Sequence, residues 1–279
     1  MLSFFPRILT YRLMLYYLAL LLACCLALGA AGMIAIRPSD LAFSALVAAA
    51  ACWSVNWIFA RSFGAVSHNE SVLITALILT FLITPFSPQD TAAIGFCLFA
   101  SAWAMASKYL LAIHKRHIFN PAALGVALAA MALHRTVSWW VGDYSILLPV
   151  IVAGGVLLLL RLRYFDLLAS FSATVLAILL ITGGPAQIAS AASQIMLHSM
   201  FCFFAFVMLT EPRTTPVGPW RHIALGVTVG ILFSPIAHVG RYYFTPEVAI
   251  LAGNIFTFLS NRRRMARWAA HLRQSPAVG

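Results

Sequence analysis

Arg116-His117-Ile118-Phe119-Asn120-Pro121 precedes an apolar run of the chain, and Arg241-Tyr242-Tyr243-Phe244-Thr245-Pro246, 125 positions later, precedes another. Upstream lies a second matched pair, Thr84-Pro85-Phe86-Ser87-Pro88 and Glu211-Pro212-Arg213-Thr214-Thr215-Pro216, at an offset of 127 to 128 positions. Two motifs repeated at nearly the same offset indicate a duplicated unit. If one unit crosses a membrane an odd number of times, the second copy inserts upside down relative to the first.

The composition is typical of a membrane protein. Of the 279 residues, 62% are hydrophobic and 9% are charged, so there are too few polar residues to cover the core of a soluble protein. Apolar segments are predicted at 14–36, 41–60, 71–86, 91–113, 121–134, 144–161, 165–183, 195–210, 221–238 and 246–260. Five fall in each half. We therefore expect an all-α polytopic protein of about ten transmembrane helices in two inverted five-helix repeats, 14–134 and 144–260.

Two features of these segments bear on the topology. The first spans about 23 residues, longer than the core of a cleavable signal, and is therefore counted as a crossing. Three others, 71–86, 121–134 and 246–260, fall short of the roughly 20 residues that a full crossing requires. Short segments of this kind are typical of folds whose helices begin inside the membrane.

The distribution of Lys and Arg tests this arrangement, because short cytoplasmic loops collect basic residues. With the amino terminus inside, the outer loops hold Arg37, Arg135 and Arg241, and the other 15 of the 18 basic residues lie inside. We expect a multi-pass protein of the cell (inner) membrane with both termini cytoplasmic, comprising a segment 1–13 and a basic tail 261–279 outside the repeats. The net charge of +11 follows from this asymmetry and suits an anionic lipid surface, so nucleic acid is not an expected partner.

Neither the cysteines nor the histidines form a metal-binding pattern. The five cysteines all lie in apolar segments without the two-residue spacing of a zinc or iron-sulfur site, and they are predicted to be small core residues. His114 and His117 flank a basic loop and are predicted to be solvated. No metal site is expected. Trp139-Trp140 resembles an aromatic anchor at the membrane interface.

Both repeated motifs have the chemistry of a helix start. Asn120 can cap the first turn of a helix whose first position is Pro121. Thr245-Pro246-Glu247 follows the same logic and adds a negative charge at the positive end of the helix dipole. Two interpretations remain open: the two helix starts form a polar site near the midplane, or they begin ordinary crossings at the headgroup level.

Thr210-Glu211-Pro212-Arg213 ends an apolar run, and it places an acid at the membrane border beside a basic residue. The two side chains form a structural ion pair, or Glu211 and Arg213 line an ion path or contact a partner subunit. Farther along, Gly226 and Gly230 have the spacing that lets membrane helices approach closely.

Taken together, these motifs resemble the NqrB/RnfD family, the membrane subunits of the sodium-pumping NADH:quinone oxidoreductase and of the Rnf electron-transport complex. The resemblance rests on the 71–79 stretch with Thr75 and the following Pro85, on Lys108 with Phe119-Asn120-Pro121-Ala122, and on Phe203-Phe204 with Thr210-Glu211-Pro212. It covers about two thirds of the chain. The family fold it implies is two inverted repeats of five helices, similar in outline to urea channels.

The chain departs from that family at the covalent flavin. The respiratory members carry flavin mononucleotide (FMN) on the Thr of a Ser-Gly-Ala-Thr motif in the loop after the fifth helix. Here the corresponding loop, 134–144, lacks this motif, and Ser172-Ala173-Thr174 lies inside a predicted crossing. Covalent FMN is therefore not expected. A noncovalent flavin, such as FMN or riboflavin, or a quinone remains compatible with the sequence.

The leading hypothesis is an electron-transport subunit of the RnfD/NqrB type that works with a redox partner or reductase. No catalytic side chain is expected, because the cofactor itself carries the redox chemistry. The residues predicted to line the cofactor site are Thr75, Lys108, Arg116, Asn120, Arg241, Thr245 and Glu247. The alternatives are a channel or transporter for a small solute or ion, and an assembly subunit that only anchors a reductase.

Overall fold

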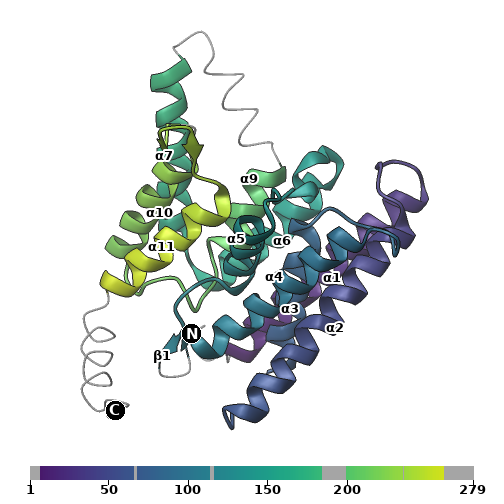
Figure 1. Cartoon of the computed structure of the whole chain (residues 1–279). Coiled ribbons are helices and arrows are strands. Elements are labelled where there is room, and N and C mark those ends of the chain that lie inside the picture. Colours follow the sequence, from purple (N-terminus) through teal and green to yellow (C-terminus); the bar gives the residue numbers. More distant parts are fainter. Residues whose placement is uncertain (1–6, 66–67, 114–115, 184–198, 235, 261–279) are drawn as a thin grey trace.

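The computed structural model describes residues 7–65, 68–113, 116–183, 199–234 and 236–260 (Figure 1). The helices of the first half are α1 (Arg7–Ala30), α2 (Pro38–Ser62), α3 (Asn69–Leu82), α4 (Thr91–Leu110) and α5 (Pro121–Leu133). Those of the second half are α6 (Leu148–Leu162), α7 (Phe165–Gly183), α9 (Ser199–Phe203), α10 (Pro219–Phe233) and α11 (Pro246–Ser260). Two 3-10 turns, Trp140–Asp143 and Ser145–Leu147, join the halves, and a π-helix, Phe204–Met208, extends α9.

The helical class and the membrane character agree with the prediction. Among the described residues, five stretches are long and apolar enough to cross a membrane: Thr10–Ala30, Pro38–Ser62, Thr91–Leu110, Ser145–Leu162 and Phe165–Thr182. The apolar helices α3, α5 and α11 are shorter, as their segments predicted. The predicted segment 1–13 overlaps α1, which already begins at Arg7, and the predicted tail 261–279 lies outside the described residues.

The same order of small elements ends each half. Strands β1 (Ala112–Ile113) and β2 (Arg116–His117) pair as an antiparallel hairpin before α5. Strands β3 (His238–Val239) and β4 (Tyr242–Tyr243) form a second hairpin before α11. Both α5 and α11 begin at a proline. The repeated sequence motifs thus correspond to a repeated hairpin and helix.

Figure 1 shows α1 to α4 gathered on one side of the molecule and α7, α10 and α11 on the other, with α5 and α6 between them. Close packing joins these layers where glycines remove side-chain bulk. A Cβ on Gly154 of α6 would overlap the ring of Tyr17 on α1, and one on Gly226 of α10 would lie 2.7 Å from the Leu167 carbonyl of α7. The expected close approach at Gly226 is confirmed, and the apolar core is continuous between the halves.

The end of α3 is buried, and other segments satisfy its free carbonyls. The backbone amides of Ser138 and Trp139 donate to the Leu82 carbonyl, at 3.1 and 3.2 Å. The indole of Trp140 donates to the Thr80 carbonyl at 2.7 Å. The expectation that Trp139 and Trp140 anchor the chain at the interface is wrong, because both are buried and bind polar groups inside the bundle.

Candidate functional site

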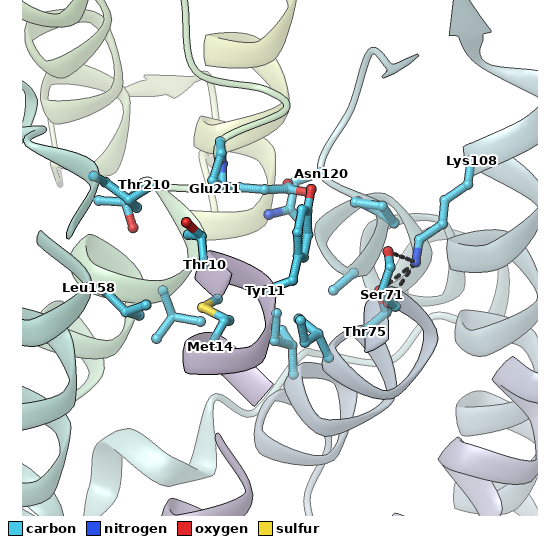
Figure 2. A pocket seen from close by; sticks show the side chains of 17 residues that line it. Thr10, Tyr11, Met14, Ser71, Thr75, Lys108, Asn120, Leu158, Thr210 and Glu211 are labelled. Atoms are coloured by element: carbon cyan, nitrogen blue, oxygen red, sulfur yellow. Dashed lines mark hydrogen bonds between the residues drawn. The ribbon is translucent and has the colours of Figure 1, made fainter. Parts of the chain in front are cut away.

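A pocket lies where the two halves meet, at the start of α5 (Figure 2). Its walls come from α1, α3, α4 and α5 of the first half and from α6 and the π-helical region of the second. The space not filled by atoms is about 580 Å³ when the open solvent at its mouth is included. The polar side chains in the wall are Thr10, Tyr11, Ser71, Thr75, Lys108, Asn120, Thr210 and Glu211.

Lys108 holds one end of the pocket. It stands near the end of α4, and its ammonium donates to three oxygens of α3: the Ser71 carbonyl at 2.9 Å, the Ser71 hydroxyl at 3.1 Å and the Thr75 hydroxyl at 2.9 Å. Figure 2 shows this side chain reaching across to Ser71 and Thr75. The three bonds fix the ammonium at the pocket wall. They also explain why Thr75 and Lys108, 33 positions apart, belong to one site.

Asn120 forms the start of α5 as its sequence predicts. Its side-chain oxygen accepts from the Ala123 amide at 3.1 Å, which caps the helix before Pro121. Its own backbone amide donates to the side-chain oxygen of Asn254, in the middle of α11, at 2.6 Å. The start of α5 therefore lies against the middle of a helix from the other half, and Asn120, Pro121 and Ala122 face the pocket.

Glu211 forms the opposite wall, and its partner is not the one expected. Its Oε1 lies 2.8 Å from Nε2 of His117 on β2, and its Oε2 lies 3.4 Å from the Thr214 hydroxyl. Of the two expected arrangements, the ion pair between Glu211 and Arg213 is not found among the described residues, where Glu211 contacts His117 instead. The prediction of a solvated His117 is also wrong, because the side chain is 3% exposed. The β1–β2 hairpin before α5 thus contacts the turn segment that follows the π-helix.

The first turns of α1 cover the pocket from a third direction. Tyr11 lies in Figure 2 between Glu211 on one side and Ser71 and Thr75 on the other. The guanidinium of Arg213 is 5.6 Å from the centre of the Tyr11 ring, a cation–π arrangement. Next to it, Arg12 Nε lies 2.8 Å from the Glu70 carboxylate at the start of α3. These contacts connect the amino-terminal turns of α1 with segments from both halves.

The structure brings together only part of the predicted site. Thr75, Lys108, Asn120 and Glu211 line one pocket. The remaining predicted residues lie elsewhere: Arg116 is half-buried on β2, Arg241 and Thr245 are exposed beside α11, and Arg213 stands over Tyr11. Glu247, also at the start of α11, is buried and accepts a 3.1 Å bond from the Trp139 indole. The two helix starts therefore differ, since only that of α5 opens into the pocket.

Sequence reasoning missed Tyr11, Ser71 and His117 as members of this site. Ser71 was visible four positions before Thr75 on the same helix face, so helical spacing alone could have included it. His117 stands three positions before the capping Asn120, and nothing in its spacing predicts that a hairpin turns it toward Glu211. Tyr11 is contributed by α1, whose contact with the distant 211–213 segment has no local signal.

No protein-family model and no curated protein matches the chain.

Proposed function

We propose that this chain is an integral membrane electron-transport subunit of the RnfD/NqrB type and that it holds a flavin noncovalently in the pocket at the start of α5. One observation carries the proposal. Polar side chains from α3, α4, α5 and the 210–211 segment converge on one open pocket between the two halves. The flavin would supply the electron chemistry, and the protein would position it beside Lys108 and Tyr11. A reductase or another redox partner would deliver electrons, and a quinone is the proposed acceptor.

The proposed membrane arrangement is two inverted five-helix repeats with both termini on the cytoplasmic side of the cell membrane. Ion pairs support it. The pairs Arg12–Glu70, His117–Glu211 and His222–Asp166 each join two segments that the charge distribution assigns to the inner side. The bond between Trp139 and Glu247 joins two segments assigned to the outer side. Contacts of this kind are expected if the loops that contact each other lie on the same side of the membrane.

A transport function is the second candidate, and the buried face of α11 favours it. Glu247, Asn254 and Thr257 recur at helical spacing on this face, and each is at most 4% exposed. Polar side chains inside a membrane bundle are typical of ion and solute paths. In this alternative the pocket would be one opening of the path and would need no cofactor.

The colour of the purified protein separates the two functions. For the electron-transport function we expect a flavin absorption spectrum that stays with the protein through gel filtration in detergent. Acid should release all of the flavin, since no covalent attachment is expected. A colourless protein that takes up a small solute in vesicles would contradict the flavin proposal and support transport.

A pair of threonine variants tests whether the flavin occupies this pocket. Thr75→Val removes a pocket hydroxyl, whereas Thr228→Val removes a hydroxyl of α10 outside it. Both threonines also bond the carbonyl four positions back, at 2.9 and 2.8 Å, so the local helical change is matched. We expect Thr75→Val to lower the flavin bound per protein severalfold and Thr228→Val to leave it unchanged. Equal flavin content in both variants would place the cofactor elsewhere.

A further inference from the structure

Lys108 is an ammonium in a membrane helix without a carboxylate partner. All seven Asp and Glu residues of the chain lie in the described ranges. The ion pairs among those ranges are Arg12–Glu70, His117–Glu211 and His222–Asp166. No Asp or Glu oxygen therefore comes within 4.0 Å of the Lys108 ammonium. A charge in this position is costly unless another group compensates it.

The neighbours of Lys108 orient its charge without neutralising it. Its three bonds go to a carbonyl and two hydroxyls of Ser71 and Thr75, which are neutral acceptors. Across the pocket, the Glu211 carboxylate contacts His117 at 2.8 Å and not Lys108. The first turn of α5, with Ala122 in the wall, adds the positive end of a helix dipole to the same space. The Lys108 end of the pocket therefore presents a cation whose hydrogen-bond partners are all neutral.

We propose that the molecule bound in this pocket supplies the missing counter-charge, as an anionic edge placed at the Lys108 ammonium. This inference rests on the proposed function in taking a flavin as the occupant. A flavin can offer such an edge in two ways. FMN carries a phosphate, and any flavin ring becomes anionic at N1 when it takes up two electrons and one proton. The shared chemistry is an anionic group facing Lys108.

The test measures binding of FMN and riboflavin to flavin-free protein, each oxidised and after reduction by dithionite. The variants are Lys108→Gln and Lys108→Met. The control is Arg61→Gln, which removes the same charge from an exposed position. If the phosphate is the counter-charge, the wild type binds FMN about tenfold or more tightly than riboflavin. If the ring is the counter-charge, it binds reduced riboflavin more tightly than oxidised by a similar factor. Either preference should disappear in both Lys108 variants and persist in Arg61→Gln.

Folding of the variants is checked on the flavin-free protein. Lys108→Met should unfold at the same temperature as the wild type or higher, because it removes a half-buried charge that lacks its counter-ion when the pocket is empty. In addition, inorganic phosphate should raise the unfolding temperature of the wild type and not that of Lys108→Gln. This arm requires no flavin.

The outcomes separate this inference from the proposed function. Flavin binding that is identical in the wild type and both Lys108 variants, in both redox states, overturns the inference and leaves the proposed function standing. A wild type that binds neither flavin but is stabilised by phosphate through Lys108 supports the inference and removes the proposed function. No response of the wild type to phosphate or to either flavin overturns both.

Discussion

Asn254 and Thr257 are buried polar side chains one turn apart on α11, and their hydrogen bonding differs. The Asn254 side chain accepts from the Asn120 amide at 2.6 Å. The Thr257 hydroxyl has no partner among the described residues. A buried polar group stabilises a fold only when it is paired, so the two positions should respond differently to the loss of their polar atoms.

Asn254→Ala should destabilise the protein by about 1–2 kcal/mol, because the Asn120 amide loses its acceptor inside the membrane bundle. Thr257→Val removes an unpaired hydroxyl at nearly constant volume, and it should be neutral or stabilising. Thermal unfolding of both variants in detergent micelles checks the pair. An Asn254→Ala protein as stable as the wild type would show that this bond does not hold the start of α5 against α11.

The site residues illustrate what single positions in a sequence reveal. The capping role of Asn120 was predictable, because Asn directly before Pro at the start of an apolar run is typical of a helix start. The structure shows this cap. The partner of Glu211 was not predictable. Arg213 is its neighbour in sequence, but a tight turn after the π-helix bonds the Thr214 and Thr215 amides to the Glu211 carbonyl. His117 then reaches the carboxylate from 94 positions away.

The packing of α7 against α10 depends on the absence of side chains at Gly226 and Gly230. Gly226→Ala should destabilise the protein by about 1–3 kcal/mol, because the new methyl group meets the backbone of α7 at Leu167 and Phe171. Gly95→Ala is the matched control, since a Cβ on this helical glycine of α4 has open space around it.

Gly95→Ala should therefore be neutral or stabilising by up to about 1 kcal/mol, from helix propensity alone. Guanidinium or thermal unfolding of both variants, in the same detergent, gives the comparison. If the two substitutions cost the same, close contact at Gly226 does not contribute to the α7–α10 interface.

Helix boundaries were predicted unevenly. The helices α2 and α10 begin at Pro38 and Pro219, before the predicted starts at 41 and 221. The bounds of α7 and α11 equal the predicted segments 165–183 and 246–260, and α5 begins at Pro121 as expected. The prediction for α1 was displaced, since the helix runs from Arg7 to Ala30 rather than over 14–36. The first turns of α1 contain polar residues, so a prediction from hydropathy starts the helix too late. The apolar run also continues past Gly32, although the chain turns there with a φ of 70°.

The helix assignments rest on local signals, and the arrangement of the two halves rests on contacts between distant segments. The duplicated motifs predicted two similar units, and the hairpin and proline-initiated helix recur in both. The position of the pocket depended on contacts that cross between units, such as the Tyr17 hydroxyl donating to the Ile151 carbonyl at 3.2 Å. Such contacts have no periodic signature in the sequence.

The proposed topology predicts which loops a membrane-impermeant maleimide can reach. Arg37→Cys and Tyr242→Cys should label from outside intact cells stripped of their outer wall. Arg61→Cys and Arg221→Cys should label only in inverted vesicles. All four positions are exposed, whereas four of the five native cysteines are buried and the fifth, Cys24, is half-buried. The unsubstituted chain gives the background, and labelling of Arg61→Cys and Arg37→Cys from one side would reject the alternation.

The π-helical turn Phe204–Met208 affects the direction in which Glu211 points. A π turn accommodates one residue more than the α-helix it replaces, and one residue corresponds to about 100° of rotation about the axis. Shortening this turn by a single residue would swing Glu211 away from His117 and out of the pocket wall. The orientation of that carboxylate is thus set by one extra residue in a helical turn upstream of it.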